Sequence, residues 1–151
     1  MRIKTLTAGA VATALLLAGC TGATKTEAAI GEPLELNGLT VTVNDAGTRT
    51  AQQGADPADW DGKEVHAYEV FIENTGDKDV DLSTVTKGAA STDAGSPVDV
   101  FDPGFYSEAL GTLPAGHKAS GKFTYGTPEG ASEITLVISG LGTDLTFSGN
   151  L

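Results

Sequence analysis

The stretch Val65–Asn74, VHAYEVFIEN, decides the fold of this chain. Successive side chains of a β-strand point to opposite faces, so an extended backbone divides these residues into two sets. One face carries His66, Tyr68, Val70 and Ile72, and the other carries Val65, Ala67, Glu69, Phe71 and Glu73. We expect the first face to lie in a hydrophobic core. The turn-forming residues that follow, Asn74–Asp77, end the strand.

The same alternation recurs along the chain. Residues 39–43 place Leu39, Val41 and Val43 on one face, and residues 134–138 and 145–147 repeat the pattern. Residues 79–84 indicate a strand with one wet face. In residues 117–125 we expect Ala119, Gly121, Phe123 and Tyr125 to face inward, and Lys118, Ser120, Lys122 and Thr124 to face outward.

No convincing helical periodicity interrupts these strands, and between residues 88 and 116 we expect one short strand near 97–101 with loop elsewhere. The sequence therefore predicts an all-β fold, an immunoglobulin-like two-sheet sandwich of six to eight strands, with a small closed barrel as the competitor.

The first nineteen residues have the pattern of a secretory signal peptide. Arg2 and Lys4 supply two positive charges, and no charged residue occurs from Thr5 to Gly19. The apolar part is too short and too rich in Thr and Gly to be a typical membrane-spanning helix. We therefore expect residues 1–19 to be a signal that is removed, residues 20–33 to be a flexible tether, and residues 34–151 to be the sandwich.

The signal ends in Leu17-Ala18-Gly19-Cys20, which resembles the lipobox of bacterial lipoproteins. The resemblance implies cleavage between Gly19 and Cys20 and a diacylglycerol on the Cys20 thiol, often with an acylated amino group. Two or three acyl chains would hold a soluble domain at the extracytoplasmic side of the cell membrane. Cys20 is the only cysteine, so an internal disulfide is impossible and the lipid gives the thiol a use.

Composition limits the partners. Without residues 1–19 the chain keeps 7 basic and 20 acidic residues, a formal charge of −13. Nucleic acids and anionic headgroups are bound through Lys and Arg, so we expect no nucleic-acid partner and attachment to the membrane through lipid alone. The sequence indicates no cofactor.

A resemblance to a protein family rests on three stretches in a fixed order, residues 38–43, 68–78 and 113–125. They read GLTVTV, YEVFIENTGDK and LPAG followed by SGKFTY. In this order they resemble a domain of unknown function with a telokin-like, immunoglobulin-type fold, found in bacterial surface lipoproteins and in an immunoprotective secreted protein of mycobacteria. That resemblance implies no catalytic residues.

Two acidic clusters are weak metal candidates. Asp77, Asp79 and Asp81 alternate like the start of a calcium loop, but the sixth and twelfth positions are Leu82 and Gly88 rather than Gly and Glu. The second cluster, Asp56, Asp59 and Asp61, lies in the loop around Trp60. His66 and His117 are the only histidines, and the mature chain lacks Met, which disfavours copper.

No nucleophile elbow, phosphate loop or zinc motif accompanies the histidines, so we interpret the domain as non-enzymatic. The leading hypothesis is a binding or interaction module whose loops present Trp60, Phe101, Phe105 and Tyr106 to a protein or small-molecule partner. The alternative for these aromatic residues is that they close the ends of the sandwich. Alternative functions are a divalent-cation buffer or sensor, or an accessory subunit of an envelope transporter or enzyme.

Overall fold

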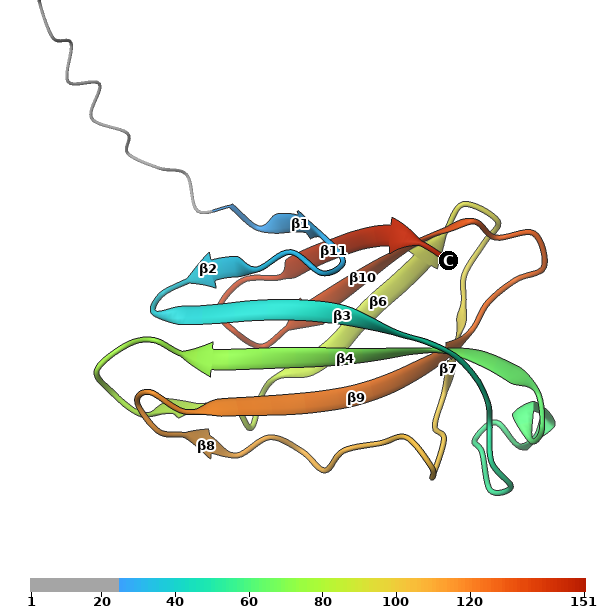
Figure 1. Cartoon of the computed structure of the whole chain (residues 1–151), viewed down its shortest axis with the longest axis horizontal. Coiled ribbons are helices and arrows are strands. Elements are labelled where there is room, and N and C mark those ends of the chain that lie inside the picture. Colours follow the sequence, from blue (N-terminus) through green and yellow to red (C-terminus); the bar gives the residue numbers. More distant parts are fainter. Residues whose placement is uncertain (1–24) are drawn as a thin grey trace, which may run out of the picture.

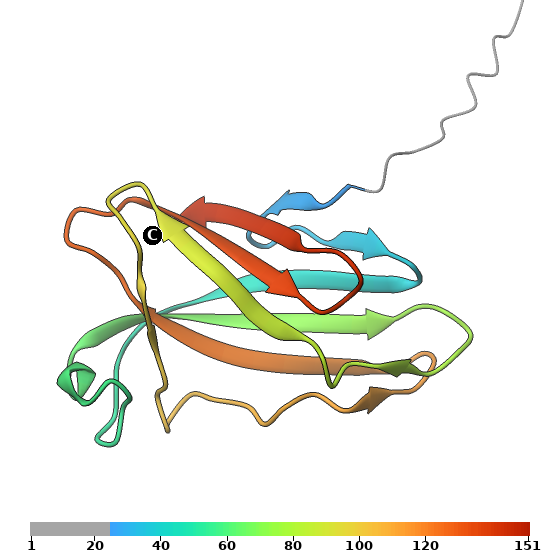
Figure 2. The ribbon, with the colours of Figure 1, turned by 180° about the vertical axis from the view of Figure 1, so that it is seen from behind.

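The computed structural model describes residues 25–151, which form a β-sandwich of two open, twisted sheets (Figures 1 and 2). The signal peptide, Gly19 and Cys20 lie outside the described residues. The strands are β1 (Glu27–Ala29), β2 (Leu34–Leu36), β3 (Leu39–Thr50), β4 (Glu64–Asn74), β5 (Val80–Asp81), β6 (Thr86–Thr92), β7 (Val98–Val100), β8 (Thr112–Leu113), β9 (Lys118–Gly126), β10 (Glu133–Ser139) and β11 (Leu145–Asn150).

The larger sheet has the order β2-β3-β4-β9-β7, and the smaller one has the order β1-β11-β10-β6. Strands β5 and β8 form a separate two-stranded pair. All pairings are antiparallel except that of β1 with β11. The two sheets stack face to face as Figures 1 and 2 show, so the fold is the expected all-β, immunoglobulin-like sandwich rather than a closed barrel.

Strand β4 is the centre of the larger sheet, with β3 and β9 paired along most of its length. Tyr68, Val70 and Ile72 are at most 5% exposed, which confirms the inward face expected of this stretch. The facing wall comes from β10 and β11, whose inward residues Leu136 and Phe147 are also fully buried. Burial raises the pKa of the Tyr68 hydroxyl, with the Asp45 carboxylate adding to the effect, so the ring stays neutral.

The first residues of β4 depart from the expected alternation. Ala67 is expected on the outer face, yet it is 1% exposed. Val65 is expected there too, yet it is 0% exposed, because the loop after β3 folds back over that face. Together with Ala51, Ala55 and Val100 it forms a second, smaller buried cluster, against which Trp60 packs. Trp60 belongs to a short 3₁₀ turn, Ala58–Trp60.

Three further expectations needed correction. Residues 86–92 form β6, an edge strand paired with β10, although its Gly and Ala content indicated loop. Thr124 is 1% exposed rather than outward, because its hydroxyl donates a hydrogen bond to the Val100 carbonyl at 2.5 Å. With the short strands β1, β2, β5, β7 and β8 included, the described residues form eleven strands, more than the six to eight expected.

The expected tether, residues 20–33, contains ordered structure at its end. Strand β1 lies inside it and adds a parallel edge to β11, so the folded part begins before Leu34. Residues 25–151 hold every strand above and both buried clusters. Within that span, no helix has the length and apolar character that a membrane crossing requires.

Candidate functional site

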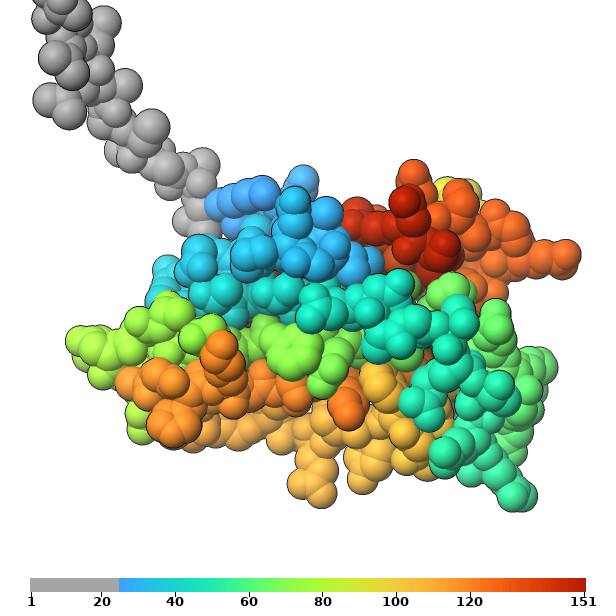
Figure 3. All heavy atoms as spheres, viewed as in Figure 1, coloured from blue at the N-terminus to red at the C-terminus, as the bar shows by residue number. Residues whose placement is uncertain are grey.

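A pocket opens at the edge of the sandwich where β6 of one sheet and β9 of the other are not bridged by strand pairing. Its volume is about 440 Å³, within the range of small-molecule sites. Val85, Lys87 and Ile138 contribute one wall, and Val70, Gly121 and Phe123 contribute the other. Part of the segment between β7 and β8, which runs along the lower edge of the molecule beneath β9 in Figure 3, closes the third side.

Two exposed aromatic side chains mark the mouth of this pocket. Phe101 is 45% exposed and Tyr106 is 51% exposed, more than any other large hydrophobic residue in the described part of the chain. Their ring centroids lie 5.2 Å apart with tilted planes, a favourable aromatic geometry. Both line the pocket, so the structure brings together two of the four aromatic residues singled out from the sequence.

The other two aromatic residues have different surroundings. Phe105 is half-buried between two cations, with the Arg49 guanidinium carbon 4.8 Å and the Lys122 ammonium 5.2 Å from its ring centroid. Trp60 is half-buried on the second cluster and does not line the pocket. For Trp60 the packing alternative therefore describes the geometry, and the aromatic residues of the candidate site are Phe101 and Tyr106.

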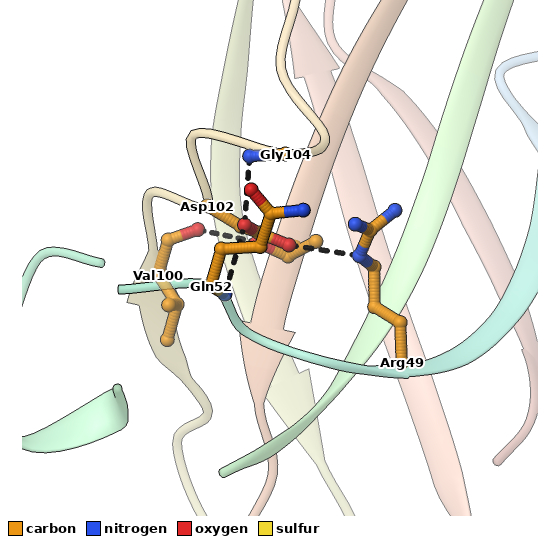
Figure 4. A network of polar contacts seen from close by, with 6 residues as sticks. Arg49, Gln52, Val100, Asp102 and Gly104 are labelled. Carbon is orange, nitrogen blue, oxygen red and sulfur yellow. Dashed lines mark hydrogen bonds and ion pairs between the residues drawn. The ribbon is translucent and has the colours of Figure 1, made fainter. Parts of the chain in front are cut away.

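A buried carboxylate fixes the backbone that carries these rings. Asp102 is 1% exposed, and its Oδ1 accepts hydrogen bonds from the Gly104 and Gln52 amides at 2.9 and 3.2 Å (Figure 4). Its Oδ2 lies 2.8 Å from Arg49 Nε, an ion pair at the end of β3. The Gly104 contact closes the turn between Phe101 and Phe105, and the contacts with Gln52 and Arg49 attach that turn to the end of β3 and the loop after it.

Sequence reasoning missed the pocket itself. The floor of the pocket includes Gly121. Gly121 occupies an inward-facing position of β9, where the alternating pattern predicts an apolar side chain. A Cβ at Gly121 would lie 3.0 Å from Val70 Cγ1, so even an alanine would be tight there. A lone glycine at an inward strand position was the available signal, because such a glycine marks a place where a neighbouring group approaches the backbone closely.

The alternating aspartates do not converge. Asp81 Oδ1 accepts a hydrogen bond from the Ser83 amide at 2.8 Å, and the bonds from Ser83 lower the pKa of Asp81. Asp79 Oδ1 accepts one from the Ala115 amide at 3.3 Å, and Asp77 is exposed. These carboxylates stabilise turns.

The second acidic cluster is likewise structural. Asp61 Oδ1 accepts hydrogen bonds from the Gly54 and Ala55 amides at 3.0 and 2.8 Å, which closes the loop around Trp60. Asp59 lies 4.0 Å from the Lys63 ammonium, and both side chains are exposed. Within residues 25–151, no three His, Cys, Asp or Glu side chains are arranged to hold a metal ion.

The two histidines lie apart from the pocket. His66 is half-buried on β4, opposite Tyr125 of β9. His117 is exposed before β9, with its Nδ1 3.0 Å from the Ala115 carbonyl oxygen. Neither lines the candidate site.

Fold and site together define a small β-sandwich with a cleft at its open edge. The chain belongs to the family described as Domain of unknown function (DUF4352), whose model matches residues 28–150. This bears out the resemblance to a domain of unknown function, and the description of the family names no activity. No curated protein matches the chain.

Two solved structures share the fold. The yjhA protein of Bacillus subtilis is 21% identical, with a TM-score of 0.52, over 79% of this chain and 97% of that one. MPT63, a secreted protein of Mycobacterium tuberculosis, is 16% identical, with a TM-score of 0.51, over 83% of this chain and 96% of that one. The chain is therefore similar in fold to a secreted protein, as the sequence suggested.

Proposed function

We propose that the protein is an exported lipoprotein, attached to the membrane by lipid on Cys20, whose sandwich is a non-catalytic binding module. The membrane attachment is supported by the lipobox-like Leu17–Cys20 and by the uncharged stretch before it. The binding role is supported by the pocket and by the aromatic pair at its mouth.

The observation that carries the binding role is the exposure of Phe101 and Tyr106 beside an open pocket. Exposed aromatic side chains are common at recognition sites, because they bury much apolar area with little loss of conformational entropy. The acidic surface elsewhere keeps the domain soluble. Exposed apolar side chains around a pocket add nothing to solubility, so their presence at this mouth indicates contact with a ligand or a protein.

Photocrosslinking in cells tests the binding role. The photoreactive residue p-benzoylphenylalanine replaces Tyr106 in the full chain, and the same residue at Phe71 serves as the control. Phe71 is 37% exposed on the outer face of β4, outside the pocket. After irradiation, intact-mass measurement should show a discrete added mass for the variant at 106 and none for the variant at 71. Absence of an adduct at 106, or equal adducts at both positions, would contradict the proposal.

The attachment has its own test. The intact mass of the membrane-extracted protein should equal that of residues 20–151 plus acyl groups. Cys20→Ala should abolish the acyl mass and release the domain from the membrane. An unmodified, soluble product from the wild-type chain would show that the lipobox resemblance was misleading.

A further inference from the structure

The pocket is apolar in its depth. Val70, Phe123 and Ile138 are buried residues of the main core, and they form the inner walls. Gly121 adds no side chain between them, and Leu110 of the covering segment is half-buried above. An apolar ligand in this pocket would lie against these side chains at the open edge between the two sheets.

Two lysines line the pocket, although the domain as a whole is acidic. Residues 25–151 hold 7 basic and 20 acidic side chains, yet Lys87 and Lys122 both line the pocket, against one carboxylate, Glu108. Lys87 pairs with Asp99, which is half-exposed beside it. Lys122 is exposed and forms no ion pair within the described residues, so its ammonium is available to an incoming anion.

We propose that this pocket binds a fatty acid, with the acyl chain against the apolar walls of the pocket and the carboxylate beside Lys122. This deepens the proposed function and rests on it, since the aromatic mouth is then the entrance for the chain. The apolar inner walls select the acyl part, and the lysine selects a negative head group over a positive one.

Fluorescence titration of residues 25–151 with cis-parinaric acid, whose emission rises in apolar surroundings, gives the first measurement. Displacement by octanoate, decanoate and dodecanoate then reports chain-length dependence. Each added methylene that enters the pocket should tighten the dissociation constant about fourfold, until the cavity is filled. Dodecylamine, which has the same chain and the opposite charge, should displace the probe far more weakly.

A charge-matched pair of variants locates the head group. Lys122→Glu should weaken dodecanoate binding about tenfold or more, as expected on losing a charge-assisted contact and gaining a repulsion. Lys78→Glu makes the same change of net charge in the turn before β5, outside the pocket, and should bind like the wild type. Thermal unfolding of both variants checks that the fold is retained.

Each result decides the proposal. A flat chain-length series, equal binding of dodecylamine, or equal effects of the two lysine variants would overturn fatty-acid binding. If fatty acids fail to bind while Tyr106 still yields a crosslinked adduct of another mass, only the ligand class is wrong. If both experiments fail, the proposed binding function falls with it.

Discussion

The substitution Gly126→Ala tests the second buried cluster, because Gly126 lies directly under the ring of Trp60. A Cβ placed on Gly126 would overlap the six-membered ring of the indole, so the tryptophan would have to leave its position. The φ angle of Gly126 lies outside the left-handed region, and its backbone can therefore accept an alanine without strain. Any destabilisation then reports the packing of Trp60.

The magnitude follows from the area that Trp60 buries. A tryptophan buries roughly 150–250 Å² when fully enclosed, so a half-buried one buries about 100 Å². At about 25 cal/mol per Å², loss of this contact lowers the free energy of unfolding by about 2.5 kcal/mol. Replacing glycine by alanine restores roughly 0.5–1 kcal/mol by restricting the unfolded chain. The expected net destabilisation is about 2 kcal/mol.

Two readouts of the same sample test this value. Urea unfolding gives the free energy, and Trp60 is the only tryptophan, so a shift of native emission to longer wavelength reports its exposure directly. Gly111→Ala is the matched control, because a Cβ there meets nothing within 4 Å. Unchanged stability and emission in Gly126→Ala would show that Trp60 does not pack on β9.

Three other predictions address polar contacts. Asp102→Ala should destabilise the fold by about 3 kcal/mol in urea unfolding, because it leaves Arg49 and two amides without their buried partner. Thr124→Val keeps the shape of the side chain but removes the buried hydrogen bond to Val100, and should cost about 1 kcal/mol in the same assay. Hydrogen bonds from Ser132 and Glu133 lower the pKa of Asp93 to about 2, so its stabilising effect is complete above the ordinary pKa near 4 and is lost as pH falls through about 2. The urea midpoint should therefore drop less between pH 5 and pH 2 in Asp93→Asn than in the wild type, and an equal drop would refute this assignment.

The alternating pattern predicted the large strands because each one has a single buried face. Residues 39–43 and 134–138 follow this rule closely, and their inward side chains are buried. It failed at Val65 and Thr124, which have outward positions but are covered by distant segments of the chain. A local pattern cannot report burial that a distant loop creates.

The candidate site was predictable only in part. Aromatic residues in a loop rich in Gly and Pro indicated Phe101 and Tyr106, but the same reasoning also included Trp60, which packs on β9. The pocket depends on the spacing of two sheets and on Gly121 facing Val70, a contact between different strands. Strand β6 was missed because an edge strand that packs through Gly88 and Ala90 carries little hydrophobic signal.

The central claim is that the opening between β6 and β9 is where this domain binds its ligand. Backbone amide resonances of ¹⁵N-labelled residues 25–151, followed during titration with dodecanoate, test it most directly. The predicted result is that the shifts concentrate on Ser107, Leu110 and Gly121, which line the pocket from two sides. Shifts centred on the outer face of β4 around Phe71 would contradict this claim, and no shifts at all would overturn the fatty-acid proposal.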